Sequence, residues 1–255
     1  MATKPDRSSA IFGNEIDERT YRKACRSKRR FERKYGVDAP GSCHLCAGEV
    51  PVIGEALGVR NLVHAERSGF DIRADAAAAP VPAATERSVS GAAGAPLVVG
   101  NIRMGFGHYR ISMAMASAAH AMGYTPYWLD LMAFPGSACT SIISEQNDLY
   151  STGSRLSQRF ALFNKLVWEP LNSEGFRKLS YNASDQKVSE LMTAPFSDLP
   201  RDVPFVGTHA WPSQAAVHAG LTRVVNAIPD NWPMALHLAE GAIHTVQTPS
   251  SFMGY

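Results

Sequence analysis

The sequence predicts an α/β fold: a Rossmann-like parallel sheet with helices, preceded by a polar, partly disordered N-terminal region. From residue 96 onward, short apolar runs alternate with helical segments, which is typical of parallel strands joined by crossover helices. Residues 1–73 are too polar to promise a core of their own. Residues 74–95 contain ten alanines and two prolines among 22 residues, a composition typical of a flexible tether.

Composition excludes several classes of protein. The 255 residues are 45% hydrophobic and 19% charged, which is enough apolar material for one large or two small cores. A net charge of +2 excludes a globally basic nucleic-acid binder and a strongly acidic protein. No apolar run is long enough to span a membrane, and the N-terminus has no secretory signal pattern. We therefore expect a cytoplasmic protein, with peripheral association at the inner face of the membrane as an extension of that expectation.

The N-terminal region, residues 1–73, has two features of its own. Residues 1–34 carry eleven Lys/Arg and five Asp/Glu, a net charge of +6, in a spacing that suits a helix. This segment is either a solvated charged helix or tail, or a contact for an anionic membrane surface. Few aromatic residues interleave with the charges, so no nucleic-acid partner is expected.

Cys43 and Cys46 form the second feature, a single CxxC pair. Two thiolates at this spacing can share one Zn²⁺, with Cys25 and His64 as further candidate ligands. The alternative is two ordinary reduced cysteines in a loop, because neither a second pair nor a redox-type strand accompanies them. Four cysteines in all do not suggest a secreted disulfide framework.

The domain at residues 96–255 is predicted element by element. Each apolar run of a few residues predicts a buried strand, and each longer segment that ends in glycine or begins with proline predicts a helix. The predicted strands are 96–102, 125–131, 203–207, 221–227 and 242–247. The predicted helices are 109–122, a mostly helical stretch over 137–191 with breaks near Gly153 and at Pro170, and 212–219. In such sheets the ligand site lies beyond the carboxyl ends of the strands.

A glycine loop follows the first of these strands: Gly105, Phe106, Gly107 and His108. Glycines allow close approach of a ligand, and free N–H groups at a helix start attract anions. A dinucleotide fingerprint needs a third glycine where Arg110 stands, and the Gly-Lys-Ser/Thr of a phosphate-binding loop is absent. His108 is therefore a candidate general base at the mouth of the site, with a helix-capping role as the alternative.

Two further loops follow strand ends and carry candidate residues. His209 and Trp211 lie between the strand at 203–207 and the next helix, where they could flank a substrate. Asp230 and Trp232 lie in a proline-bounded loop after the strand at 221–227, and Asp230 could orient or polarise His108. Each loop taken alone is also compatible with a purely structural role.

Taken in this order, the glycine loop, the THAW segment at 208–211 and the segment at 224–251 resemble a known family. The resemblance is to the N-terminal domain of GT-B glycosyltransferases, of the monogalactosyldiacylglycerol synthase and processive diacylglycerol glucosyltransferase kind. It covers residues 96–255 and none of the first 95. In that family an Asp follows the fourth strand directly, whereas this sequence has Asn226 there and Asp230 slightly later.

The resemblance implies an activity. The domain would bind a lipid or glycan acceptor, with His108 assisting the acceptor hydroxyl as base and Asp230 as its catalytic companion. Gly105, Phe106, Gly107, His209, Trp211 and Trp232 would contact substrate. The donor would be a nucleotide sugar held mainly by a C-terminal donor domain, which the sequence is expected to lack. No cofactor is implied.

Two apolar segments, 131–136 and 166–171, are candidates for facing a membrane or lipid, with burial in the core as the alternative. The competing function for the whole chain is a non-catalytic binding or scaffolding module with a basic arm. These two hypotheses differ over His108, because only the catalytic one needs its imidazole.

Overall fold

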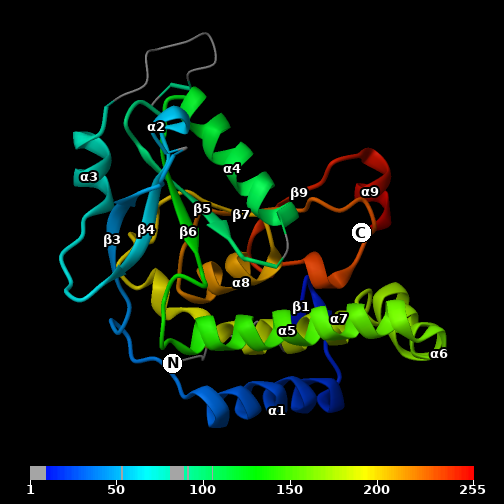
Figure 1. The fold of residues 1–255 in the computed structure, drawn as a ribbon. Helices are drawn as coiled ribbons and strands as arrows, with labels where there is room; N and C mark the ends of the chain where they lie inside the picture. The colour runs from blue at the N-terminus through cyan, green and yellow to red at the C-terminus, as the bar shows by residue number, and fades with distance from the viewer. Residues whose placement is uncertain (1–9, 53, 81–88, 91, 105) are drawn as a thin grey trace.

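The computed structural model describes residues 10–52, 54–80, 89–90, 92–104 and 106–255. Its centre is a seven-stranded sheet in the order β3-β4-β6-β5-β7-β8-β9 (Figure 1). β3 is antiparallel to β4, and every other neighbouring pair is parallel. The strands are β3 (His44–Glu49), β4 (Arg60–Ala65), β5 (Pro96–Asn101), β6 (Thr125–Asp130), β7 (Phe205–Gly207), β8 (Val224–Ala227) and β9 (Ile243–Thr245). The α/β prediction and all five strands predicted after residue 95 are thereby confirmed.

Helices follow the strands in sequence. The α-helices are α1 (Glu18–Tyr35), α2 (Gly54–Leu57), α3 (Ile72–Ala78), α4 (Phe106–Ala121), α5 (Ala138–Arg159), α6 (Ala161–Phe163), α7 (Leu179–Ser189), α8 (Ala210–His218) and α9 (Pro249–Gly254). Shorter π or 3₁₀ segments are η1 (Asn164–Trp168), η2 (Leu171–Gly175), η3 (Glu190–Met192), η4 (Ala194–Phe196) and η5 (Ala235–His237). A separate antiparallel pair, β1 (Ala10–Ile11) and β2 (Asn14–Glu15), precedes α1. No helix in the described part of the chain is long and apolar enough to cross a bilayer.

Alternation along the strands divides the core into two layers. Val99 and Trp128 point to the face that α4 covers, where they cluster with Met113 and Ala116. The neighbouring side chains, such as Val98 and Leu129, belong to the larger cluster on the other face, with residues from α5 and α8. This period-2 division explains why both central strands are almost uniformly apolar.

The N-terminal region belongs to the same sheet, which corrects the predicted boundary between 1–73 and 96–255. β4 pairs with β6 in parallel, and Leu45 and Leu62 are fully buried in the main core. α3 occupies the start of the predicted linker and buries Ile72 and Ala76. Residues 81–88 and 91 lie outside the described part of the chain. The polar composition of residues 1–73 hid this, because β3 and β4 each supply only one apolar face. The remainder of the core comes from β5 and β6.

The basic segment is confirmed as a helix, α1, and it is packed rather than free. Ala24 and Phe31 are buried, and Ala24 clusters with Ala183 of α7. Lys28 pairs with Glu190 at 2.7 Å, and Tyr35 donates to Glu145 of α5 at 2.8 Å. Most of the described residues between 10 and 73 therefore lie in helices and strands, while residues 1–9 and 53 lie outside the described part.

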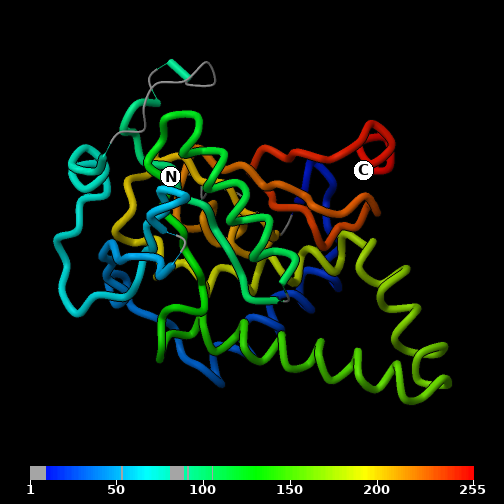
Figure 2. The backbone as a smooth tube through the Cα atoms, turned by 45° about the horizontal axis from the view of Figure 1, so that its top comes forward, coloured from blue at the N-terminus to red at the C-terminus, as the bar shows by residue number. Residues whose placement is uncertain are grey.

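α5 and the segments after it form a hairpin that projects from the body of the molecule (Figure 2). The predicted break near Gly153 is absent, because α5 runs through it. A Cβ at Gly153 would lie 2.3 Å from the Trp168 ring, so this glycine lets η1 return along α5. The predicted break at Pro170 is also absent, because Pro170 keeps helical dihedrals and the helical run continues through it; the break lies at Phe160 instead, which is extended.

Candidate functional site

The order of the strands places a crevice at the carboxyl end of β5. The chain proceeds from β5 to β6 on one side and reaches β7 on the other, so the connections after β5 and β7 diverge there. Such a switch point is where open parallel sheets bind ligands. The glycine loop follows β5, and the His209 loop follows β7, so the sequence-predicted site residues converge on this crevice.

Two glycines lie opposite each other in neighbouring strands at this point. Gly100 and Gly207 are register partners in β5 and β7. A Cβ on Gly100 would lie 2.2 Å from the ring of Phe205, which is fully buried. Glycine is therefore needed at Gly100 for packing, and this signal was not used in the sequence prediction.

His108 lies in the first turn of α4, and one of its ring nitrogens is hydrogen-bonded. Its Nδ1 is 2.7 Å from the carbonyl oxygen of Thr208. Because a carbonyl only accepts, Nδ1 carries the proton and Nε2 presents a lone pair. Burial lowers the pKa of His108, with the Thr208 hydrogen bond opposing this in part. The imidazole is therefore neutral at pH 7 and able to accept a proton.

His209 is buried beside it and has a capping role. Its Nδ1 accepts from the backbone N–H of Trp211 at 3.1 Å, as N-cap of α8. The His108 and His209 rings meet edge to face at 5.0 Å, and the His209 and Trp211 rings at 5.3 Å. Burial lowers the pKa of His209 well below its usual value, and the nearby His108 and His237 lower it further. Two neutral imidazoles therefore pack side by side without charge repulsion.

These side chains form one wall of a cavity of about 380 Å³. The opposite wall comes from the hairpin and is apolar and aromatic. Its lining residues are Met104, His108, Gln146, Leu149, Tyr150, Trp168, Leu171, Asn172, Phe176, Tyr181, His209, Trp211, Asp230, Met234, Leu236 and His237. A largely apolar cavity with few convergent polar groups is the usual form of a small-molecule site. The hairpin residues were missed because they carry no motif, only helical spacing.

Asp230 lines this cavity, but the structure does not give it the predicted contact with His108. Its Oδ1 accepts from the Trp232 backbone N–H at 2.9 Å, which forms a local turn. The orienting partner of His108 is the Thr208 carbonyl instead. Asp230 acts on a different histidine: its charge opposes the lowering of the pKa of His237 that burial causes.

Three other predicted residues lie away from the cavity lining. Phe106 is 81% exposed, and Trp232 is 54% exposed with the Arg177 guanidinium 5.5 Å from its ring centroid. A Cβ on Gly107 would meet no atom within 4 Å, so packing does not require glycine there. Gly105 lies outside the described residues.

Asn226, at the position where an Asp was anticipated, is a structural residue. It is buried, its Oδ1 accepts from Ser213 at 2.9 Å, and its Nδ2 donates to the His237 carbonyl at 2.6 Å. The amide therefore ties α8 to η5 and holds the loop that carries His237. A carboxylate could accept from Ser213 but could not donate to that carbonyl.

Asp185 lies behind the cavity wall on α7, and sequence reasoning did not find it. The carboxyl is buried, which raises its pKa to about 7, while a hydrogen bond from the Trp211 side chain opposes the rise. Its Oδ2 has no hydrogen-bond partner in the described part of the structure. Asp185 therefore holds the Trp211 ring of the cavity wall from behind. The sequence held no signal for it beyond an acidic residue within a predicted helical stretch.

The two segments proposed to face a membrane separate in the structure. In 131–136, Leu131 and Phe134 are buried in the main core, so the alternative of core burial holds for this segment. In 166–171, Leu166 and Val167 are exposed on the hairpin. Both segments are apolar, and only the tertiary arrangement distinguishes them.

A family model described as a domain of unknown function, DUF6937, matches residues 10–255. The chain belongs to this family. No curated protein and no solved structure matches the chain. The DUF6937 match begins before α1 and ends at the last residue, so the family unit includes β3, β4 and α1 together with the parallel strands.

The CxxC pair of this DUF6937 chain does not form a metal site. Cys43 lies just before β3 and is buried against the main core, whereas Cys46 lies inside β3 and is half-buried. Within the described residues, no group of three or more His, Cys, Asp or Glu side chains is placed to hold a metal ion. The described structure therefore does not bring three of the candidate zinc ligands Cys25, Cys43, Cys46 and His64 together.

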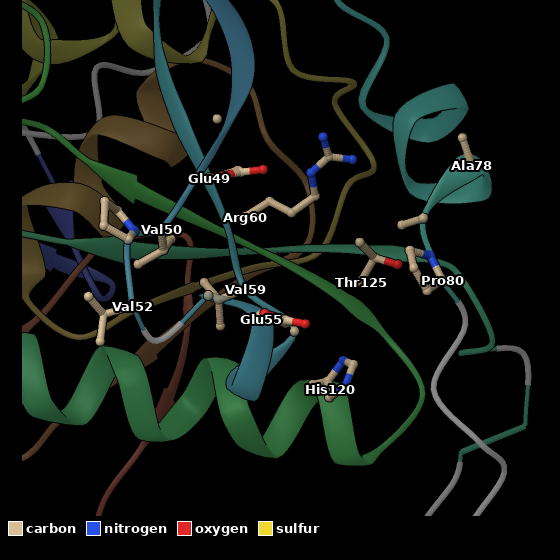
Figure 3. Close-up of a pocket in the computed structure, with 15 residues that line it drawn as sticks. Glu49, Val50, Val52, Glu55, Val59, Arg60, Ala78, Pro80, His120 and Thr125 are labelled. Carbon is tan, nitrogen blue, oxygen red and sulfur yellow. The ribbon is translucent and has the colours of Figure 1, made fainter.

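A second cavity of the DUF6937 unit lies at the other end of the strands (Figure 3). It measures about 780 Å³ and is lined by the β3–β4 connection, the end of α3 and His120. Its main cation is already paired, since Arg60 lies 2.6 Å from Asp75. None of the candidate motifs faces this cavity, so the crevice with His108 remains the candidate site.

Proposed function

We propose that this chain is the acceptor-binding half of a GT-B-type hexosyltransferase, which transfers a hexose from a nucleotide sugar to a lipid acceptor. The observation that carries the proposal is His108. It stands at a helix N-terminus beside the switch point, neutral, with Nδ1 fixed by Thr208 and Nε2 available. That is the state a general base needs.

The chemistry follows from this geometry. Nε2 of His108 accepts the proton of an acceptor hydroxyl as its oxygen forms a bond to the anomeric carbon of the donor. The nucleoside diphosphate leaves with the bonding electron pair. Thr208 stabilises the imidazolium, because its carbonyl accepts from the protonated ring. Asp230 lines the same cavity, but a diacylglycerol has a single hydroxyl, which is assigned to His108, so Asp230 is given no step in the transfer.

The cavity supports a lipid acceptor over a free sugar. Its hairpin wall presents Leu149, Trp168 and Leu171, and its far end presents Phe176 and Met234. Such a lining gains free energy by burying acyl carbons, roughly 0.8 kcal/mol for each CH₂ group. In the GT-B arrangement the nucleotide sugar is held across the cleft by a second domain, so this chain supplies the acceptor side.

The test is hexose transfer by the chain produced in its source organism, where a donor domain would be supplied, because the acceptor half alone is expected to be inactive. Radiolabelled UDP-hexoses and dioleoylglycerol in mixed micelles are the substrates, and the variants are His108→Ala and His64→Ala. His64 is the matched control, because it is exposed on β4 and has only an edge contact with Phe134. We expect a loss of about 100-fold or more for His108→Ala and no change for His64→Ala.

Absence of transfer, with dioleoylglycerol binding unaffected by His108→Ala, would overturn the catalytic proposal. That result would support the competing function, a non-catalytic lipid-binding module. Equal loss of transfer in both variants would also contradict a specific role for His108.

A further inference from the structure

A series of large apolar side chains is exposed along the hairpin, residues 149–171. We infer that this hairpin docks on an anionic lipid bilayer. Its exposed apolar side chains are Leu149, Tyr150, Leu156, Phe160, Leu162, Leu166, Val167 and Leu171. Leu162 is 71% and Leu166 is 64% exposed, both at the tip. A soluble surface rarely gathers so many large apolar groups in one short segment unless they meet a partner.

The positive charges of the hairpin favour a negatively charged partner. Residues 149–168 contain Arg155, Arg159 and Lys165 and no Asp or Glu, and the nearest carboxylates along the chain, Asp148 and Glu169, flank this stretch. Long cationic side chains beside apolar and aromatic groups are typical of segments at the headgroup level of a membrane. Each cation near an anionic surface adds a favourable electrostatic contribution. The pattern therefore matches an anionic bilayer.

The same charges disfavour a second copy of this chain. A symmetric dimer through the tip would bring the three cations of each hairpin against those of the other. No carboxylate in 149–168 could offset this repulsion. The hairpin also projects from the body (Figure 2), which suits a flat partner.

Neighbouring helices extend the basic character of this part of the molecule. α1 runs alongside α5 (Figure 1) and exposes Arg19, Lys23, Arg26 and Arg29. Its acidic neighbours are largely used within the fold, as in the pairs Arg22–Glu18 and Lys28–Glu190. The bilayer thus meets apolar groups at the hairpin and further cations beside it.

The hairpin also forms one wall of the cavity. Leu149, Tyr150, Trp168 and Leu171 contribute to both the hairpin and the cavity lining. A lipid could therefore pass from the bilayer along the hairpin to His108. This step alone rests on the proposed function; the docking surface does not.

The experiment is co-sedimentation of the full chain with vesicles. One set is phosphatidylcholine alone, and the other contains phosphatidylglycerol. The test variant is the pair Leu162→Glu with Leu166→Glu, and the matched control is Ile243→Glu. Ile243 is 69% exposed, on β9 at the edge of the sheet. All three side chains are surface groups, so circular dichroism should be unchanged.

We expect binding to phosphatidylglycerol vesicles that falls about tenfold or more in the tip variant and is unchanged in the control. Raising the salt from about 0.1 M to about 0.5 M should weaken binding several-fold. No binding by the wild-type chain, or equal loss in the control, would overturn the inference. So would a tip variant that turns a dimer into a monomer without affecting vesicle binding. Because no sugar transfer is measured, failure here leaves the proposed function untouched.

Discussion

At the scale of single residues, the main feature of the candidate site is that burial favours the neutral forms of His108, His209 and Asp185. The half-buried His108 and His209 rings lie side by side, with Nδ1 of His108 donating to a carbonyl and Nδ1 of His209 accepting from a backbone N–H. Asp185 is buried on the other side of Trp211 with a raised pKa. The neutral imidazoles and the apolar side chains of this wall favour an apolar ligand, and burial keeps the His108 imidazole unprotonated.

The first residue-scale prediction concerns the pH dependence of transfer. Because burial lowers the pKa of His108 below 6.5, its base form persists at mildly acidic pH. Transfer should therefore stay constant from pH 8 to about pH 6.5 and fall only under more acidic conditions. A log kcat/KM profile measures this. A fall that already begins between pH 8 and pH 7 would contradict the assignment.

The second concerns Asp185 and stability. Its folded pKa of about 7 exceeds the ordinary 3.8, so the folded state binds the proton more tightly. Stability from this group is present below pH 3.8 and is lost as the pH rises toward 7. Asp185→Asn should therefore stabilise the chain more at pH 8 than at pH 5, by on the order of 2–3 kcal/mol. Urea unfolding at the two pH values tests this; an equal effect at both would contradict it.

At the scale of elements, two glycines that look alike in the sequence have different roles. Gly100 lies near the end of a strand against the buried Phe205 ring, whereas Gly107 lies at the start of α4 in open space. The sequence pattern pointed to the glycine loop and not to Gly100. The reason is physical: a motif shows small residues, but only the packed neighbours show which one has no room for a methyl group.

These glycines provide a matched pair of substitutions. Gly100→Ala should cost about 1–3 kcal/mol of stability, because the methyl group overlaps a ring that cannot move away. Gly107→Ala should be neutral or stabilising by up to about 1 kcal/mol, because alanine favours the helix. Thermal unfolding of both variants decides the matter. Equal destabilisation would mean that the first turn of α4 is packed differently.

The strands and helices after residue 95 were predictable because each carries a clear apolar period and a clear end signal. The hairpin wall of the cavity was not, since Leu149 and Trp168 look like core residues in the sequence. The role of Asn226 was hidden for a similar reason. Its partners, Ser213 and the His237 carbonyl, come from separate elements.

At the scale of the whole molecule, the sheet unites segments that the sequence divides. β4 joins the parallel strands through β6, and α1 packs on α7 and α5. The alanine-rich composition of 74–95 predicts a domain boundary. Composition indicates only local flexibility, and it does not show that the edge of β6 pairs with a strand from the N-terminal region. Tyr127 and Leu129 of β6 are buried in the same cluster as Leu45 and Leu62 of the N-terminal strands.

A truncation tests this integration. A chain that begins at residue 90 loses β3, β4 and α1, and with them the cover over β6 and α7. We expect it to aggregate or to unfold without a cooperative urea transition, whereas the full chain unfolds in one transition. A cooperative transition in the truncated chain would restore the predicted independent domain.

The central claim is that the cavity beside His108 holds a lipid acceptor. Photocrosslinking with a diazirine-labelled diacylglycerol, followed by peptide mapping, tests it most directly. We predict labelling of Trp168 or Tyr181 that excess dioleoylglycerol abolishes, since both line the cavity. Labelling confined to the cavity near His120, or labelling that dioleoylglycerol does not displace, would contradict the account.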